Sequence, residues 1–324
     1  MRKTAALLLI LALAFGLAAC GGRSETAGDP SGSPSPGPDA NETTAPLFDP
    51  FKTGDPSVSD RDTTAPDTGT DDPVAGSDGL EIREYDDESL MVVGPGEFSG
   101  EDLVIPSDAG GRPVVRIEED AFCQTPILRL TVPGTVQWIC EDAFENCDML
   151  ETLILSEGNL GIGEGAFAAC RSLKSLTVPA TVEHIGRSAF KECLSLQEVV
   201  VKGNAALGSY AFAECRSLQS VVFSGTAGIP YSVSSEAFSG DGALETVTFS
   251  EGLTEIGSFC FEGCPNLKTL YLPKSLAFVG PSAFAGTGLD KVYYAGSEEE
   301  WKAIAIGSGN DPLNGGEIVY NYAG

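Results

Sequence analysis

The chain has 324 residues, of which 47 are acidic and 19 are basic, so its formal net charge is -28. This charge argues against an electrostatic grip on nucleic acid or on anionic lipid, because both require patches of Lys and Arg. It favours a basic or charge-indifferent partner, or a solvated surface that resists self-association.

Residues 1–19 have the pattern of an export signal. Arg2 and Lys3 precede an apolar run that ends Leu17-Ala18-Ala19-Cys20. The run is too short for a membrane-spanning helix, which needs about twenty residues. Cys20 directly after Leu-Ala-Ala resembles the lipobox of bacterial lipoproteins, which implies that its sulfur is diacylated and that it becomes the new N-terminus. An ordinary secretory cleavage site with a chance cysteine is the alternative.

Acylation of Cys20 would anchor the chain to the extracellular face of a bacterial cell membrane and would be its only membrane contact.

The linker at residues 20–79 is rich in Pro, Ser, Thr and Asp. Residues 21–79 contain nine prolines, twelve acids and three bases. Such a segment buries too little apolar surface to offset its ordering entropy, so we expect a disordered stalk. Its apolar interruption at Leu47, Phe48 and Phe51 is either a short docking motif or has no role.

Residues 80–116 contain short apolar runs separated by Gly, Pro and Asp, which predict strands and turns. We expect an N-terminal β cap here, since an exposed first rung would invite pairing with other chains.

Residues 117–288 carry a repeat that is marked by phenylalanine. Its eight copies contain Phe122, Phe144, Phe167, Phe190, Phe212, Phe238, Phe261 and Phe284. Successive differences are 22, 23, 23, 22, 26, 23 and 23 residues. So steady a period predicts a stack of units that bury their apolar faces against one another.

Each repeat changes its apolar spacing part-way along. In segment 166–173, Ala-Phe-x-x-Cys-x-x-Leu, apolar residues lie three apart, which predicts a tight helical turn. Segment 173–178, Leu-x-x-Leu-x-Val, alternates, which predicts a strand with Leu176 and Val178 facing inward, ended by Pro179. The prediction is a β-rich solenoid of about eight rungs with short helical turns, capped at both ends.

The full unit reads Val-x-x-Ile-Gly-x-x-Ala-Phe-x-x-Cys-x-x-Leu-x-x-Leu-x-Val-Pro. Over about residues 100–296 it resembles the BspA-type leucine-rich repeat of bacterial surface proteins. Thr125, Asp241 and Thr287 replace the cysteine, and the sixth copy is lengthened near Tyr231. The resemblance implies a leucine-rich repeat fold and adhesion to components of a host or a neighbouring cell.

Residues 289–324 differ from the repeat and predict a C-terminal cap. Ser297 and Glu300 form the pattern of a capping box that begins a short helix, and Trp301 is expected to cover the last rung. Residues 317–322 predict a closing strand.

Five cysteines occupy one repeat position, three residues after the phenylalanine. They are Cys147, Cys170, Cys193, Cys215 and Cys264. A disulfide or metal ladder and a column of buried thiols are both conceivable; missing CxxC pairs and poor disulfide geometry between adjacent rungs favour buried thiols. Cys123, Cys140 and Cys260 lie outside this register and are the better candidates for reactivity or pairing.

Catalytic signals are weak. The single histidine, His184, lies in a segment that predicts a solvent-facing structural residue. The run Gly161-Ile162-Gly163 mimics a dinucleotide loop but lies between repeat segments, outside any βαβ unit. We therefore expect no enzyme, metal or cofactor.

The residue between the two inward strand positions must point outward. These residues are Thr131, Ile154, Thr177, Val200, Val222, Thr248, Tyr271 and Tyr293, and we refer to them as the strand file. Aligned apolar and aromatic side chains on a surface favour a binding site, whereas a general preference of such residues for strands is the alternative.

The predicted function is that of a monomeric, non-catalytic cell-surface lipoprotein that binds an extracellular protein. An envelope spacer or assembly scaffold without a dedicated ligand is the second hypothesis.

Overall fold

The computed structural model describes residues 76–322. The predicted signal peptide, Cys20 and the linker up to residue 75 lie outside these residues. No helix within the described residues is long and apolar enough to cross a bilayer.

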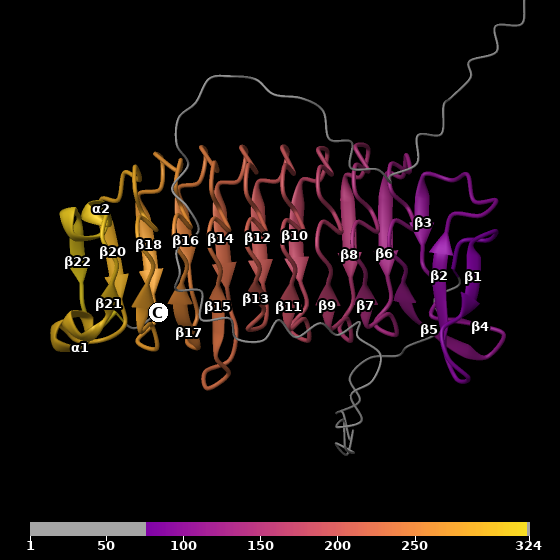
Figure 1. Ribbon diagram of the computed structural model, residues 1–324, viewed down its shortest axis with the longest axis horizontal. Coiled ribbons are helices and arrows are strands. Elements are labelled where there is room, and N and C mark those ends of the chain that lie inside the picture. The colour runs from indigo at the N-terminus through magenta and orange to yellow at the C-terminus, as the bar shows by residue number, and fades with distance from the viewer. Residues whose placement is uncertain (1–75, 323–324) are drawn as a thin grey trace, which may run out of the picture. The chain divides into compact units, whose positions relative to one another are not determined.

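The repeats form a solenoid in which each turn adds one strand to each of two stacks (Figure 1). The first stack holds β3 (Asp102–Val104), β6 (Arg129–Val132), β8 (Thr152–Leu155), β10 (Ser175–Val178), β12 (Glu198–Val201), β14 (Ser220–Phe223), β16 (Thr246–Thr248), β18 (Thr269–Leu272), β20 (Lys291–Tyr294) and β22 (Glu317–Val319). Apart from β8 and β10, consecutive strands of this stack pair in parallel, as expected when successive turns advance in one direction.

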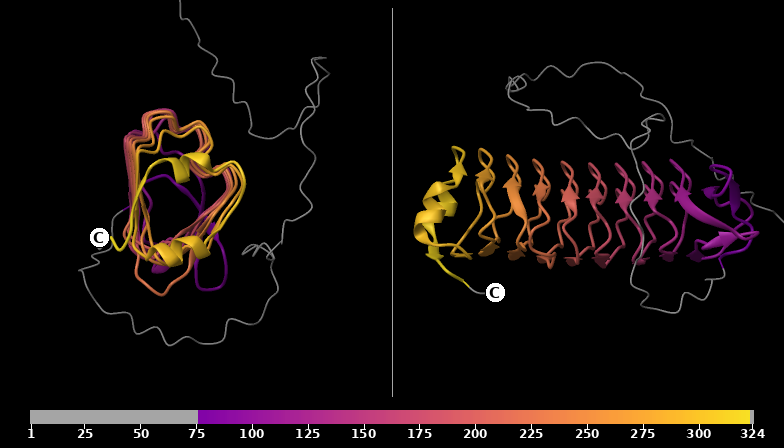
Figure 2. Two further views of the ribbon diagram at one scale, coloured as in Figure 1. Left: turned by 90° about the vertical axis from the view of Figure 1, so that its left-hand side faces the viewer. Right: turned by 90° about the horizontal axis from the view of Figure 1, so that it is seen from below.

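The second stack lies on another side of the same turns (Figure 2). It holds β1 (Glu81–Glu84), β2 (Leu90–Gly94), β5 (Arg112–Ile117), β7 (Trp138–Ile139), β9 (Gly161–Ile162), β11 (His184–Ile185), β13 (Ala206–Leu207), β15 (Tyr231–Val233), β17 (Leu253–Ile256), β19 (Phe278–Val279) and β21 (Ala305–Ile306). The short β4 (Asp108–Ala109) pairs with β5. These findings confirm the predicted β-rich solenoid.

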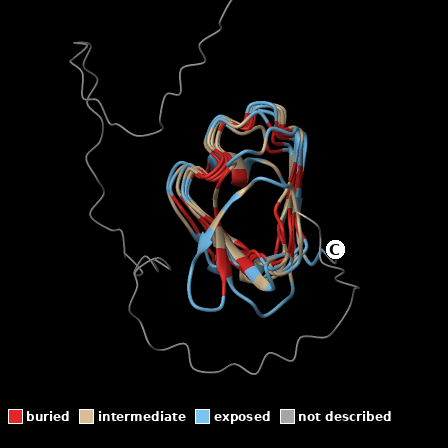
Figure 3. Ribbon diagram, turned by 90° about the vertical axis from the view of Figure 1, so that its right-hand side faces the viewer, coloured by how far each residue is buried: buried red, intermediate tan, exposed pale blue. Residues whose placement is uncertain are grey.

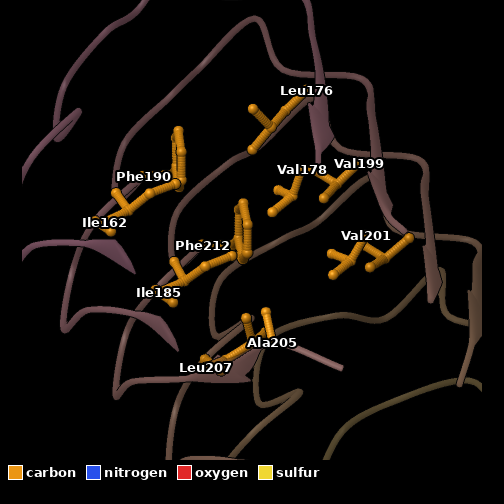
Figure 4. Close-up of a cluster of buried hydrophobic side chains, with 14 of the residues drawn as sticks. Ile162, Leu176, Val178, Ile185, Phe190, Val199, Val201, Ala205, Leu207 and Phe212 are labelled. Atoms are coloured by element: carbon orange, nitrogen blue, oxygen red, sulfur yellow. The ribbon is translucent and has the colours of Figure 1, made fainter. Parts of the chain in front are cut away.

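The buried hydrophobic residues of successive turns form one continuous core cluster. Figure 3 marks the buried residues in red along the turns. In Figure 4, inward residues of the first stack point toward the rings of Phe190 and Phe212, with Ile185 and Leu207 on the opposite side. All eight repeat phenylalanines are 0% exposed. Their ring centroids lie 5.1–5.6 Å apart along the stack, close to the spacing of paired strands.

The turns that carry the phenylalanines contain i→i+3 hydrogen bonds, such as Cys170 N–H to Phe167 O at 3.3 Å, but do not wind into helices. The residues two before and two after each phenylalanine have positive φ; around Phe144 they are Asp142 (51°) and Asn146 (57°). This alternation turns every second N–H toward the next rung: Phe144 N–H donates to Ala166 O at 2.8 Å. The turns therefore pair with one another much as strands do.

Both ends of the stack carry additional structure. At the start, β1 and β2 pair antiparallel, while β3 and β5 already pair with the first repeat strands β6 and β7. At the other end lie α1 (Glu298–Ala303) and α2 (Asp311–Gly315).

The helix α1 begins with the expected capping box between Ser297 and Glu300. Its Trp301 is 6% exposed and packs edge-on against Tyr294, with ring centroids 5.2 Å apart. The predicted closing strand is wrong beyond Val319, because Asn321 adopts a left-handed conformation (φ 56°) that turns the chain back toward β20.

Candidate functional site

The strand file lies on the outer side of the first stack, and its members are aligned by strand register. Thr177 pairs with Val200, and the register continues through to Tyr271 and Tyr293. Thr131 pairs with Ile154 in a separate run. The hydrogen-bonded ladder breaks between β8 and β10, which belong to different sheets although they lie in contact on consecutive turns.

The break coincides with the most open part of the file. Ile154 is 51% exposed and Thr177 is also exposed, whereas the other members are half-buried. Half-burial follows from stacking: each outward side chain is covered on two sides by its neighbours one rung away.

No member of the strand file is charged, although the chain as a whole carries a charge of -28. The neighbouring outward column, two residues earlier in each strand, holds hydroxyls at most central rungs and Glu198. Its remaining charges are paired at the ends, Arg129 with Asp102 at 2.5 Å and Lys291 with Glu317 at 3.1 Å. The strand file is therefore an uncharged strip on an acidic protein, beside a column that carries mainly hydroxyls at its centre and ion pairs at its ends.

Tyrosines form the C-terminal end of this strip. The rings of Tyr271 and Tyr293 are stacked, with centroids 4.7 Å apart and an interplanar angle of 6°. Tyr322, after the turn at Asn321, tilts against both rings at centroid distances of 5.3 and 5.0 Å. Lys291 Nζ lies 5.7 Å from the Tyr293 ring centroid, a cation–π arrangement. Burial, followed by the neighbouring tyrosines, raises the pKa of Tyr271.

Three further residues belong to this face. Val104 pairs with Thr131 at one end, and Val319 pairs with Tyr293 at the other. The spacing of the terminal strands could have identified these two valines. Tyr322 carries no such signal, because its place depends on the fold-back of the chain.

The five in-register cysteines are 0% exposed and unpaired. Each thiol donates to the carbonyl of the phenylalanine one repeat earlier. These Sγ–O distances are 3.2 Å for Cys147 to Phe122, 3.3 Å for Cys170 to Phe144, 3.4 Å for Cys193 to Phe167, 3.2 Å for Cys215 to Phe190 and 3.1 Å for Cys264 to Phe238. A thiol suits this position because it is small, apolar and still a weak donor.

Two of the out-of-register cysteines are also inert in the fold. Cys140 is 2% exposed and Cys260 is 0% exposed, and both are free thiols. Burial raises the pKa of Cys140 to about 12 and that of Cys260 well above its ordinary value. The expectation that these two would be reactive or paired is wrong, because burial disfavours the thiolate.

The outer side of the second stack lacks a comparable strip. His184 is exposed on β11, in register with Gly161 and Ala206. The ring of Trp138 covers Gly161, so that no Cβ would fit there. Phe278, 39% exposed, is in register with Glu255. Exposed aromatic residues on this side are thus separated by small or charged residues.

The turns form a third, polar side with two shallow hollows. The larger, about 490 Å³, is bordered by Lys191, Glu192 and Tyr210, whose hydroxyl donates to Glu236 at 2.6 Å. Beside the smaller hollow, burial and then Glu145 raise the pKa of Asp142 to about 6. Within residues 76–322, no group of three or more His, Cys, Asp or Glu side chains is arranged to hold a metal ion.

Comparison with known families decides the classification. Residues 115–231 and 203–305 match the model of the BspA type leucine-rich repeat region, with six copies. The chain belongs to this family. Leucine-rich repeats generally mediate protein binding and are typically non-catalytic, so the family favours a protein-binding scaffold.

Solved structures agree with this assignment. A leucine-rich repeat protein from Bacteroides ovatus is 25% identical with a TM-score of 0.55, over 75% of this chain and 70% of that chain. A leucine-rich repeat protein from T. pallidum is 27% identical with a TM-score of 0.54, over 60% of this chain and 90% of that chain. No curated protein matches the chain.

Proposed function

We propose that this protein is a non-catalytic lipoprotein of the bacterial cell surface that binds another protein through its strand file. The observation that carries this proposal is the uncharged strip from Val104 to Val319 on a chain whose net charge is -28. A solvent-facing strip of uncharged, largely apolar and aromatic side chains favours association, and its tyrosines are typical residues of binding hot spots.

The partner is an extracellular protein of a host or a neighbouring cell. The chain binds it while anchored to the membrane through Cys20. The acidic surface around the strip favours a partner whose rim is basic or uncharged, since like charges at the rim of an interface oppose association.

Binding is tested by capture of surface proteins on the full chain, with quantification of each captured species. Replacement of both Tyr271 and Tyr293 by Ser removes the stacked pair. We expect at least a tenfold loss of affinity, since two hot-spot residues contribute more than about 1 kcal/mol each. The matched control is Phe278→Ser, which removes an exposed aromatic residue from the second stack.

Equal capture by both variants and by the wild type, with the fold intact, would exclude the strand file as the binding surface. If the wild type captures no protein, the spacer hypothesis gains instead. Anchoring is tested separately by metabolic labelling with a fatty acid: label on the wild type and none on Cys20→Ser is the expected result, and an unlabelled wild type would remove the anchor.

A further inference from the structure

Asp241 breaks the most regular hydrogen-bond pattern of the core. In five repeats, a cysteine thiol donates to the phenylalanine carbonyl one repeat earlier. In the repeat of Phe238 this position is held by Asp241, which is 0% exposed. The phenylalanine stack continues through this repeat, since the rings of Phe212 and Phe238 are stacked with centroids 5.6 Å apart.

Only one of the two carboxyl oxygens of Asp241 has a partner. Oδ1 accepts the Cys215 backbone N–H at 2.7 Å. Oδ2 is fully buried and has no hydrogen-bond partner. A buried, ionised carboxylate with one oxygen that accepts no hydrogen bond would strongly destabilise the folded chain.

The carbonyl oxygen of Phe212 is a second buried-core atom that lacks a hydrogen-bond partner among the described residues. In five other repeats this carbonyl accepts the cysteine thiol of the next repeat and, commonly, an N–H of its own turn. Phe190 O, for example, accepts the Cys215 thiol at 3.2 Å and the Cys193 N–H at 3.4 Å. Cys215 N–H is instead directed to Asp241. In the described part of the chain, no hydrogen bond reaches Phe212 O.

We propose that Asp241 is a neutral carboxylic acid whose O–H donates a hydrogen bond to the Phe212 carbonyl, and that this hydrogen bond links the two repeats. The repeat register places its side chain where the other repeats place the thiol donor, and protonation supplies both missing partners at once. The fifth and sixth repeats are thus joined by a bond that depends on pH.

The surroundings of Asp241 favour the neutral form. The titratable groups that face it are Cys215 and Glu214 from the preceding repeat, and Cys260 and Cys264 from the following one. None of them is cationic. Burial, followed by the neighbouring Cys215, raises the pKa of Asp241 well above its ordinary value.

The sign of the effect on stability follows from proton binding. An unfolded aspartic acid loses its proton near pH 4, whereas the folded chain retains the proton on Asp241. Folding therefore binds one additional proton above that pH, and stability falls as the pH rises, until the folded group also ionises.

The test compares the full-length wild type with Asp241→Asn and Asp241→Cys across the range from about pH 5 to 7. The Asn variant retains an acceptor at Oδ1 and has a permanent donor in place of the acid, and the Cys variant restores the thiol of the other repeats. The ratio of the wild-type unfolding constant to that of either variant should rise about tenfold per pH unit. Contributions from all other acids cancel in this ratio.

Infrared spectroscopy of the native proteins at neutral pH tests the protonation state without unfolding. The wild type should show the carbonyl stretch of a protonated carboxylic acid, and this band should be absent from both variants. A flat ratio of unfolding constants, or a wild-type spectrum with carboxylate bands alone, would overturn the proposal. If the Asn variant fails to fold, the Cys variant provides both comparisons.

Discussion

The stacked phenylalanines give a prediction whose size depends on position along the solenoid. Phe190 is 0% exposed and lies between Phe167 and Phe212, with both ring centroids 5.2 Å away. Truncation to Ala removes the buried ring and leaves a cavity whose walls are held apart by the adjacent rungs. We expect a loss of about 3–5 kcal/mol in the free energy of unfolding.

Phe284 is the matched comparison, because it is equally buried but stacks on a single repeat ring, that of Phe261 at 5.1 Å. An aromatic pair contributes about 0.5–1.5 kcal/mol beyond its buried area. Phe284→Ala should therefore cost about that much less than Phe190→Ala.

Urea denaturation followed by circular dichroism and by tryptophan fluorescence measures both values. Coincident transitions show that the stack unfolds as one unit, whereas a split transition in Phe190→Ala would show that the lesion uncouples its two halves. A cost below about 2 kcal/mol at Phe190, or an equal cost at both positions, would refute a contribution from ring stacking.

Two further predictions concern titratable groups. Alkylation with peptide mapping should leave Cys147, Cys170, Cys193, Cys215 and Cys264 unmodified in the native chain and modify them in denaturant; rapid native labelling of these sites would contradict their burial. Asp142→Asn should stabilise the chain at neutral pH, because burial raises the pKa of Asp142 to about 6 and folding therefore opposes its ionisation as the pH rises from about 4 to 6. The gain should stay below about 1 kcal/mol, since the side chain is only half-buried and solvent screens it, and it should vanish near pH 4, as measured by urea denaturation across that range.

The sequence was sufficient to predict the solenoid because its constraints are local and periodic. The phenylalanine spacing and the alternation from Leu173 to Val178 specify which side chains face inward, and every rung applies the same rule. Neither feature shows whether the strands of two adjacent rungs are joined by hydrogen bonds. The break in the hydrogen-bonded ladder between β8 and β10 thus has no visible cause in the repeat pattern.

The left-handed turn residues were also beyond sequence reasoning. The position two before the phenylalanine holds Asp142, Gly165, Tyr210 or Phe259 in different repeats, all with φ between 51° and 60°. These side chains share no property that favours this conformation, and a bulky residue there is unusual. The conformation comes from the ladder between turns, which needs every second N–H to point at the next rung.

The strand file and Asp241 show opposite relations between sequence and fold. An outward strand position accepts threonine, valine, isoleucine or tyrosine with little change in the backbone, so the solenoid does not require a stacked pair at Tyr271 and Tyr293. Their place at one end of an uncharged strip therefore supports the binding role that we propose for the strand file. Asp241 is fully buried in the core, and in our proposal one proton gives both its Oδ2 and the Phe212 carbonyl a hydrogen-bond partner. Residue choices that the repeat fold does not require are thus informative: on the surface they point to binding, and in the core they point to protonation.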